Sequence, residues 1–288
     1  MTAEPPSPAN LRLGPYKLSL SGPCLIMGIL NITRDSFSAD GLLDTPDAIL
    51  RKAEGMVRDG ADVLDLGGET AGTSREAISV QAEIDRTAPW IARIAQRLEV
   101  PISINSWRFP VVQAALEAGA VLVNDIGGLS DLRLAEASAD HGAGLVVMHL
   151  RGQPKVPHLQ EQYGDVIQEM IRFFQEKTAS ALHAGLAPDQ LLLDPGIDFA
   201  KQPQHNLQIM NRMRTLTSAL PYPWLAAISR KTIIGQILGG QPPAERDPGT
   251  CALTVSACLG GCHMVRVHNV AAMRDVVRIL DAIQRTSL

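Results

Sequence analysis

Eight short apolar runs recur along this chain, and the segments between them have a different periodicity. The runs are rich in Val, Ile and Leu, as strands buried on both faces require. Between them, apolar residues recur at the spacing of amphipathic helices. Strands that alternate with helices pair in parallel, so eight such units predict an α/β fold of the (β/α)8, or TIM, barrel type. The length of 288 residues is near the usual size of that fold.

The predicted strands cover Leu25–Leu30, Asp62–Leu66, Ile102–Ile104, Val121–Val123, Gly144–Met148, Leu191–Leu193, Trp224–Ile228 and Met264–Val267. The clearest predicted helices cover Ala48–Arg58, Val80–Arg97, Phe109–Ala118, Tyr163–Ala184, Leu207–Leu220 and Val270–Ala282. Residues 11–21 alternate around Gly14-Pro15 and predict a short N-terminal β-hairpin. We expect residues 1–10 to form a flexible tail and residues 11–288 to form one domain. A doubly wound open sheet is the alternative, but no Gly-x-Gly-x-x-Gly turn follows the first strand.

Every predicted strand is followed by, or ends in, a polar or ionisable residue. In a barrel the carboxyl ends of the strands meet at one face, which is where active sites lie. A single polar residue at such a place is an ordinary turn residue, whereas eight together predict a polar pocket. These residues are Asn31, Asp65, Asn105, Asn124-Asp125, His149, Asp194, Ser229-Arg230-Lys231 and His268.

The stretch LLLDPGIDFAK, residues 191–201, ends its apolar run in Asp194. Pro195 and Gly196 follow at once and stop the strand, because proline lacks a backbone donor and glycine permits a sharp turn. Taken alone, Asp194 is as well explained as a cap of that turn. The other polar strand ends favour a carboxylate that faces the pocket.

The pocket residues suit a planar heterocycle with amino and keto groups, which needs paired donors and acceptors along one edge. Asp194 and Asn124 would recognise that edge, and Lys231 would contact a ring nitrogen or carbonyl. Arg266 and His268 share one face of a strand and suit a phosphate, although a structural hydrogen-bonded pair is the alternative. Thr232 begins a predicted helix, where it would contact an anion, cap the helix, or do both.

Seven segments of the chain resemble dihydropteroate synthases, in the same order and with compatible spacing. They are MGILNITRDSFS at 27–38, DLGGET at 65–70, LVNDIGGLSD at 122–131, VMHLRG at 147–152, LLLDPGIDFAK at 191–201, SRKTIIGQ at 229–236 and VRVHNV at 265–270. The resemblance implies a TIM barrel that joins a dihydropterin pyrophosphate to p-aminobenzoate and releases pyrophosphate, in folate synthesis. It also implies a homodimer formed through the late helices near Cys251–Gly261 and Val270–Ile283.

The resemblance implies a role for each matching position. The residues implied to bind the pterin are Asn105, Asn124, Met148, Asp194, Phe199 and Lys231. Those implied to bind the pyrophosphate are Asn31, Arg266 and His268, with Asn31 also a ligand of Mg²⁺. Those implied to lie by the p-aminobenzoate are Phe199, Ser229 and Thr232. Asp194, Lys231 and Asn31 would carry the catalytic duty, and no protein nucleophile is implied.

Three positions depart from the family pattern. The third strand usually ends Ile-Asp-Thr but here ends Ile104-Asn105-Ser106, which removes one negative charge from the pterin side. The second loop has Ala71 and Gly72 where the family has threonine and arginine. Arg34 replaces a proline of the first loop. We expect Arg34 and Arg75 to compensate for the missing loop arginine.

Two other functions remain open at this point: a methyltetrahydrofolate-dependent methyltransferase, and a pterin-binding paralogue without synthase activity. Remodelling on the p-aminobenzoate side would also weaken sulfonamide binding, because those drugs occupy that subsite in the family. A net charge of −4 gives no electrostatic signal for nucleic acid. No apolar run approaches the ~20 residues that span a bilayer, and no signal peptide is evident. We therefore expect a cytoplasmic protein that does not bind membranes and acts on small molecules.

Overall fold

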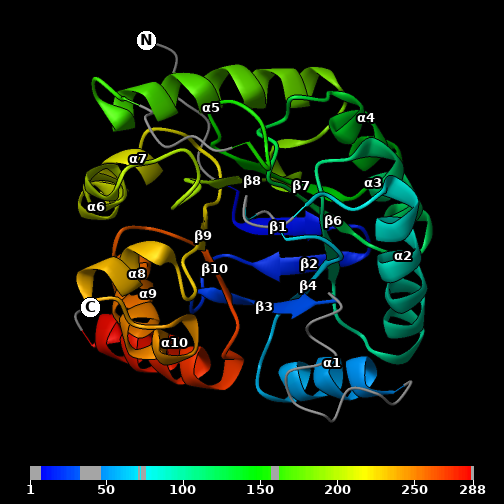
Figure 1. The fold of residues 1–288 in the computed structure, drawn as a ribbon, viewed down its shortest axis with the longest axis horizontal. Helices are drawn as coiled ribbons and strands as arrows, with labels where there is room; N and C mark the ends of the chain where they lie inside the picture. Colours follow the sequence, from blue (N-terminus) through cyan, green and yellow to red (C-terminus); the bar gives the residue numbers. More distant parts are fainter. Residues whose placement is uncertain (1–7, 33–46, 71, 73–75, 157–161, 287–288) are drawn as a thin grey trace.

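The structure, a computed structural model, describes residues 8–32, 47–70, 72, 76–156 and 162–286. Eight parallel strands form its centre (Figure 1), in the order β8-β7-β6-β5-β4-β3-β10-β9. A parallel bridge between Leu193 and Trp224 joins the two ends of this order, which closes the sheet into a barrel and excludes the open doubly wound alternative. The strands are β3 (Leu25–Asn31), β4 (Val63–Gly67), β5 (Ile102–Asn105), β6 (Leu122–Asp125), β7 (Gly144–Met148), β8 (Leu191–Asp194), β9 (Leu225–Ala227) and β10 (Met264–Val267).

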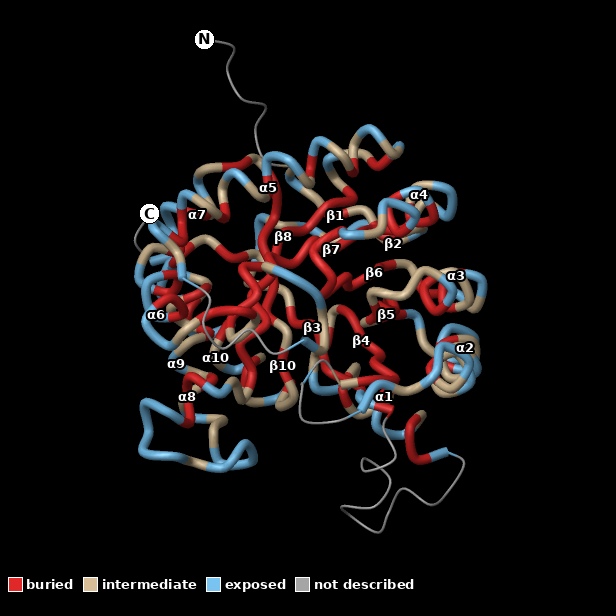
Figure 2. Tube along the Cα trace, turned by 45° about the horizontal axis from the view of Figure 1, so that its top comes forward, coloured by how far each residue is buried: buried red, intermediate tan, exposed pale blue. Residues whose placement is uncertain are grey.

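Helices surround the strands, and their inner faces are buried while their outer faces are exposed (Figure 2). The α-helices are α1 (Ala48–Arg58), α2 (Val80–Arg97), α3 (Phe109–Glu117), α4 (Arg133–Asp140), α5 (Val166–His183), α6 (Pro203–Asn211), α7 (Met213–Thr217), α8 (Thr232–Ile237), α9 (Asp247–Leu259) and α10 (Val270–Arg285). Two short 3-10 turns, η2 (Pro188–Gln190) and η3 (Pro243–Glu245), precede β8 and α9. None of the helices in the described part of the chain is long and apolar enough to cross a membrane.

Two predicted helices differ from the structure in an informative way. The single helix predicted at 207–220 is two helices, α6 and α7, because the backbone leaves helical geometry at Arg212. The helix predicted from Tyr163 begins three residues later, where the Asp165 side chain accepts hydrogen bonds from the Ile167 and Gln168 amides. This cap satisfies amides that have no partner within the helix and so fixes its start.

The predicted hairpin closes the bottom of the barrel. Strands β1 (Asn10–Leu13) and β2 (Tyr16–Ser19) pair antiparallel around Gly14, which has a left-handed φ of 55°. Leu11 and Leu13 are fully buried against the N-terminal ends of the barrel strands. β1 begins at Asn10, inside the predicted tail, and residues 1–7 of that tail lie outside the described residues.

The barrel interior is apolar at the bottom and polar at the top. Side chains alternate between the interior and the helices along each strand, so interior positions recur every two residues. The lower interior layer is Met27, Val63, Leu122, Val146, Leu192, Leu225 and Met264. The next interior layer, two residues farther along each strand, is Ile29, Asp65, Asn124, Met148, Asp194, Ala227 and Arg266. The change between these layers places ionisable groups directly above a sealed hydrophobic base.

Candidate functional site

A cavity of about 530 Å³, here called the central cavity, opens at the carboxyl ends of the barrel strands. All the residues with an implied binding role except Thr232 line it, namely Asn31, Asn105, Asn124, Met148, Asp194, Phe199, Ser229, Lys231, Arg266 and His268. The side chains come from seven different strands or the turns that follow them. The structure therefore brings together residues that lie far apart in the sequence.

A second cavity of about 600 Å³, here called the outer cavity, adjoins the central one. Gly72, Phe199 and Lys231 line both. Thr232 lines the outer cavity. The two cavities therefore adjoin at Phe199 and Lys231, and this place is here called the junction.

Asp65 is fully buried at the base of the central cavity and connects three of its neighbours. Its Oδ2 accepts hydrogen bonds from Arg266 Nε at 2.6 Å, from Asn124 Nδ2 at 3.2 Å and from Asn105 Nδ2 at 3.5 Å. Asp65 Oδ1 and Asn124 Oδ1 are also buried and have no hydrogen-bond partner among the described residues. Buried polar atoms of native proteins are normally paired, so these two oxygens point to a ligand or to water.

Asp194 is 2% exposed at the end of β8. Burial raises the pKa of its carboxyl group, and the Gly196 amide, which donates to Oδ1 at 2.8 Å, opposes that rise together with the charges of Lys231, Lys201 and Arg266. The turn-cap role and the pocket role are therefore both present, because one residue makes the turn contact and also lines the cavity.

Lys231 lies across the cavity junction. Its Nζ donates to the Ile197 carbonyl at 2.8 Å and lies 4.4 Å from the centroid of the Phe199 ring. Burial lowers the pKa of this ammonium group, whereas the charges of Asp198 and Asp194 raise it. Lys231 is thus held by the loop that follows β8, and the carboxylates of Asp194 and Asp198 act on its charge.

Ser229 and His268 hold each other at the rim. Ser229 Oγ lies 2.9 Å from His268 Nδ1 and accepts the His268 amide at 3.1 Å. Burial and the neighbouring Arg266 lower the pKa of His268 to about 3, so the ring is neutral at physiological pH. His268 is therefore a neutral imidazole, with one N–H donor and one acceptor nitrogen.

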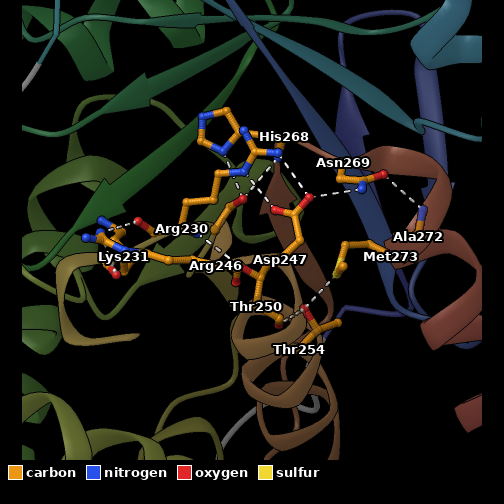
Figure 3. Close-up of polar contacts among 11 residues, drawn as sticks. Arg230, Lys231, Arg246, Asp247, Thr250, Thr254, His268, Asn269, Ala272 and Met273 are labelled. Carbon is orange, nitrogen blue, oxygen red and sulfur yellow. Dashed lines mark hydrogen bonds and ion pairs between the residues drawn. The ribbon is translucent and has the colours of Figure 1, made fainter. Parts of the chain in front are cut away.

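A network of hydrogen bonds, here called the clamp, holds the turn between β9 and α8 (Figure 3). Arg230, with a left-handed φ of 55°, forms two hydrogen bonds to Asp247 at 2.7 and 3.0 Å. Asp247 also accepts Asn269 Nδ2 at 3.0 Å, and Arg246 donates to the Arg230 carbonyl at 3.1 Å. This clamp fixes the backbone at Arg230. The residues on either side of it, Ser229 and Lys231, line the central cavity.

Thr232 meets a carboxylate of the chain itself. Asp198 Oδ2 accepts the amides of Thr232 and Ile233, at 2.5 and 3.4 Å. These are the amides that the sequence predicted for an incoming anion. In the structure the first turn of α8 is therefore capped from the loop after β8.

Several polar residues at strand ends do not line the central cavity. Asp125 accepts the amides of Gly127 at 2.7 Å and Leu129 at 2.6 Å, and burial raises its pKa to about 6. The His149 ring packs against Phe173 with centroids 4.8 Å apart. Both residues stabilise turns or packing outside the central cavity, so the predicted ring of eight converging groups is incomplete.

The sequence predicted no part for Asp198 and Lys201 in the site, and it predicted Asp65 as a polar strand end of the pocket without a specific role. Lys201 is 8% exposed and donates to the carbonyls of His149, Gly196 and Phe199 at 3.0 to 3.1 Å, and burial lowers its pKa to about 7. Asp65 follows Val63 by two residues and so shares its interior face, which agrees with its predicted place among the polar strand ends. Nothing in the sequence signalled the loop contacts of Asp198 and Lys201.

The departures in the first two loops are only partly described. Gly72 lines both cavities, whereas Arg34, Ala71 and Arg75 lie outside the described residues. Compensation by Arg34 and Arg75 stays a prediction. Among the residues that the structure does describe, no cluster of three or more His, Cys, Asp or Glu side chains could hold a metal ion.

Comparison with known proteins gives a consistent result. A model of the pterin-binding enzyme family matches residues 27–268. The dihydropteroate synthase of Synechocystis sp. is 40% identical over 261 residues, which is 90% of each chain. The Yersinia pestis dihydropteroate synthase, solved with a sulfonamide drug complex, superposes with a TM-score of 0.89 at 35% identity and covers 96% of this chain and 99% of that one.

The Xanthomonas albilineans dihydropteroate synthase, solved with 4-aminobenzoic acid, superposes with a TM-score of 0.88 at 34% identity. That match covers 96% of this chain and 98% of the other. The family model and the relatives span most of the barrel strands and the turns that carry the cavity residues. The chain therefore belongs to the dihydropteroate synthase family of pterin-binding enzymes.

Proposed function

We propose that this chain is a working dihydropteroate synthase, a transferase that condenses 6-hydroxymethyl-7,8-dihydropterin pyrophosphate with p-aminobenzoate to give dihydropteroate and pyrophosphate. One observation carries the proposal. The central cavity has the carboxylate of Asp194 and the amide of Asn124 on its lining, and the same cavity is lined by Arg266 and His268. A site for a neutral heterocycle thus adjoins a site for an anion, as the substrate requires.

Asp194, Asn124 and Lys231 would bind the pterin edge. One oxygen of Asp194 already accepts the Gly196 amide, which leaves the other for an N–H of the pterin ring. Asn124 Oδ1 has no described partner and would accept a second one. Met148 is 1% exposed and Phe199 stacks under Lys231, so both would contact the ring faces.

The reaction then needs little covalent help from the protein. The bond between the pterin CH₂ and the pyrophosphate oxygen breaks, and its electron pair leaves with the pyrophosphate. Asp194 stabilises the positive charge that spreads over the pterin, while Arg266 and the neutral His268 stabilise the leaving group. The p-aminobenzoate nitrogen forms the new bond to CH₂ and releases one proton to solvent or to the pyrophosphate.

Mg²⁺ is the cofactor that we propose, with Asn31 as its protein ligand. Mg²⁺ commonly binds through one or two protein oxygens together with substrate phosphates and waters. Asn31 lines the cavity, and Gly67 leaves the space beside it open, since a Cβ there would lie 3.7 Å from Asn31 Oδ1. When bound, Mg²⁺ would neutralise charge on the departing pyrophosphate.

The acceptor would lie at the junction of the two cavities, next to Phe199, Ser229 and Thr232. Phe199 lines both cavities, Ser229 lines the central cavity and Thr232 lines the outer cavity. Binding of 4-aminobenzoic acid by the Xanthomonas albilineans relative supports an acceptor of this class. Reduced sulfonamide sensitivity and a cytoplasmic location stay predictions from the sequence.

We further propose a homodimer formed through α9 and α10. Three large apolar side chains on these helices are exposed: Leu259 at 45%, Ile279 at 63% and Ile283 at 59%. Apolar residues gathered on one face of a soluble protein often mark a protein–protein contact. Sedimentation of the purified chain, with Ile279→Glu as the disrupting variant, tests this proposal.

The decisive experiment combines the protein with dihydropterin pyrophosphate, p-aminobenzoate and Mg²⁺. We expect pyrophosphate release that requires p-aminobenzoate. Pterin binding without turnover would instead identify the non-catalytic paralogue, whose best support is the departure from the family pattern at Asn105, Ala71 and Gly72. Methyl transfer from a methylated folate to a corrinoid would identify the remaining alternative, against which Arg266 and His268 argue because that reaction has no pyrophosphate.

A further inference from the structure

Asp198 occupies an unusual place in the loop that follows β8. Its φ of 70° lies in the left-handed region, which side chains other than glycine rarely adopt, although aspartate tolerates it better than most. Its own amide donates to Asn206 Oδ1 at 2.9 Å, and Asn206 Nδ2 returns a bond to Asp198 Oδ1 at 3.1 Å. This reciprocal pair fixes the Asp198 side chain in one orientation.

The second carboxylate oxygen of Asp198 is directed to the outer cavity wall. Oδ2 accepts the amides of Thr232 and Ile233. Asp198 itself lines the outer cavity, together with Phe199, Lys231 and Thr232. A negative charge is therefore built into the wall beside the place proposed for the acceptor.

The charge of Asp198 reaches the cavity lysine. Among the charged neighbours of Lys231, Asp198 has the largest effect and raises the pKa of its ammonium group, with Asp194 next. Asp198 thus cancels part of the positive potential that would otherwise attract an anionic acceptor. Lys201, which also lines the outer cavity, is affected in the same direction.

We infer that Asp198 determines the charge selectivity of this enzyme toward its arylamine acceptor. The inference rests on the proposed synthase function and concerns the acceptor side of that site. An anionic acceptor beside Thr232 is repelled by Asp198, whereas an acceptor with an uncharged para substituent is not. The chain therefore discriminates only weakly between p-aminobenzoate and neutral arylamines that carry a hydrogen-bonding group in the para position.

The test compares two acceptors that differ in charge, p-aminobenzoate and p-aminobenzamide, at saturating dihydropterin pyrophosphate and Mg²⁺. The variant Asp198→Asn keeps the size of the side chain and an oxygen for the Thr232 amide but removes the charge. We expect the KM for p-aminobenzoate to fall by about three- to tenfold, from the loss of one nearby negative charge in a partly solvated site. The KM for p-aminobenzamide should change by less than about twofold.

Asp198→Gly supplies a second variant that suits the left-handed backbone, and it should shift the ratio of the two KM values in the same direction. Asp165→Asn is the matched control, because Asp165 also caps a helix but does not line either cavity. An unchanged ratio in both Asp198 variants with turnover preserved overturns the inference alone. Absence of turnover by the unmodified chain with either acceptor overturns the proposed function, and the inference with it.

Discussion

Arg266 Nε donates to Asp65 Oδ2 over 2.6 Å, although the two residues are 201 positions apart in the chain. The pair joins β10 to β4 through the barrel interior, where Asp65 is fully buried and the Arg266 side chain is 17% exposed. Nε is used by this bond, and the two terminal nitrogens of the guanidinium make no hydrogen bond to another described residue. A buried carboxylate thus aims the arginine that would bind the pyrophosphate.

Replacing Asp65 with Asn should separate this pair while keeping the side-chain volume. Breaking a buried ion pair from one side lowers the free energy of unfolding by about 3 kcal/mol. Because Arg266 loses its orientation, the KM for dihydropterin pyrophosphate should rise and kcat should fall by about 100-fold. Urea unfolding and steady-state kinetics measure the two effects.

Asp62→Asn is the control for Asp65→Asn. Asp62 forms an ion pair with Arg274 at 2.7 Å at the other end of the barrel. The Asp62→Asn variant should have a lower free energy of unfolding but an unchanged KM for dihydropterin pyrophosphate. Equal kinetic effects in the two variants would show that Asp65 acts only through stability.

Asp194→Asn should lower kcat by at least about 100-fold, because it removes the charge that faces the developing pterin cation. Turnover requires ionised Asp194, and burial raises its pKa above 3.8. The rate of the unmodified enzyme should therefore fall as the pH drops through that raised pKa, and the variant should lose this acid limb. A pH–rate profile of both proteins makes the comparison.

Asp194→Asn should lower kcat but should not lower the free energy of unfolding. A carboxyl group with a raised pKa in the folded state binds protons more tightly there, so its ionisation reduces stability as the pH rises through the raised pKa. The Asn variant should be as stable as the parent, or more stable, at neutral pH. Asp125→Asn is the matched control, a buried carboxylate at a strand end that does not line the central cavity, and near-normal kcat in Asp194→Asn would contradict the mechanism.

Asn105→Asp should be tolerated or should improve turnover at about pH 8, because it adds a negative charge on the pterin side. Asn105 Nδ2 lies 3.5 Å from Asp65 Oδ2, so the new carboxylate would stand beside an existing one. Like charges raise the pKa of one of the two groups, and the acid limb of the rate profile should move to higher pH. Asn105→Ala, which adds no charge, serves as the comparison, and a loss of kcat at every pH in Asn105→Asp would contradict this expectation.

Asp247→Asn should loosen the turn that carries Ser229 and Lys231. The Arg230 side chain is 30% exposed and that of Asp247 is 23% exposed, so we expect a loss of about 1 kcal/mol and a Tm lower by about 2–4 °C. The hydrogen bond from Arg230 lowers the Asp247 pKa below 3.8, so this stabilisation is present above pH 3.8 and is lost as the pH falls through the folded pKa. Thermal unfolding across this range measures it.

The kinetic effect of Asp247→Asn should be a rise in the KM of both substrates, since the turn lies between their two proposed subsites. Asp281→Asn removes an exposed ion pair with Arg285 and should leave every KM unchanged. If the Asp247 variant changes Tm but neither KM, the clamp serves stability alone.

The sequence by itself determined the barrel and the cavity-facing positions on its strands. Alternation along a strand is a local property, so Asp194 above Leu192 and Arg266 above Met264 follow from spacing alone. The ends of α1 and α2 were also predicted to the residue, because their periodicity is local. The same alternation places Asp65 above Val63 inside the barrel, in agreement with its prediction as one of the polar strand ends.

Tertiary structure alone decided which of these groups meet. The partner of Arg266 depends on barrel closure, and the contact of Asp198 with Thr232 depends on how two loops fold over the strand ends. Asp125 comes directly after the interior residue Asn124 and therefore faces the other side of the sheet, where it accepts the amides of Gly127 and Leu129. Spacing fixes the direction of a side chain from its own strand, whereas its partner is set by contacts between segments that are distant in the chain.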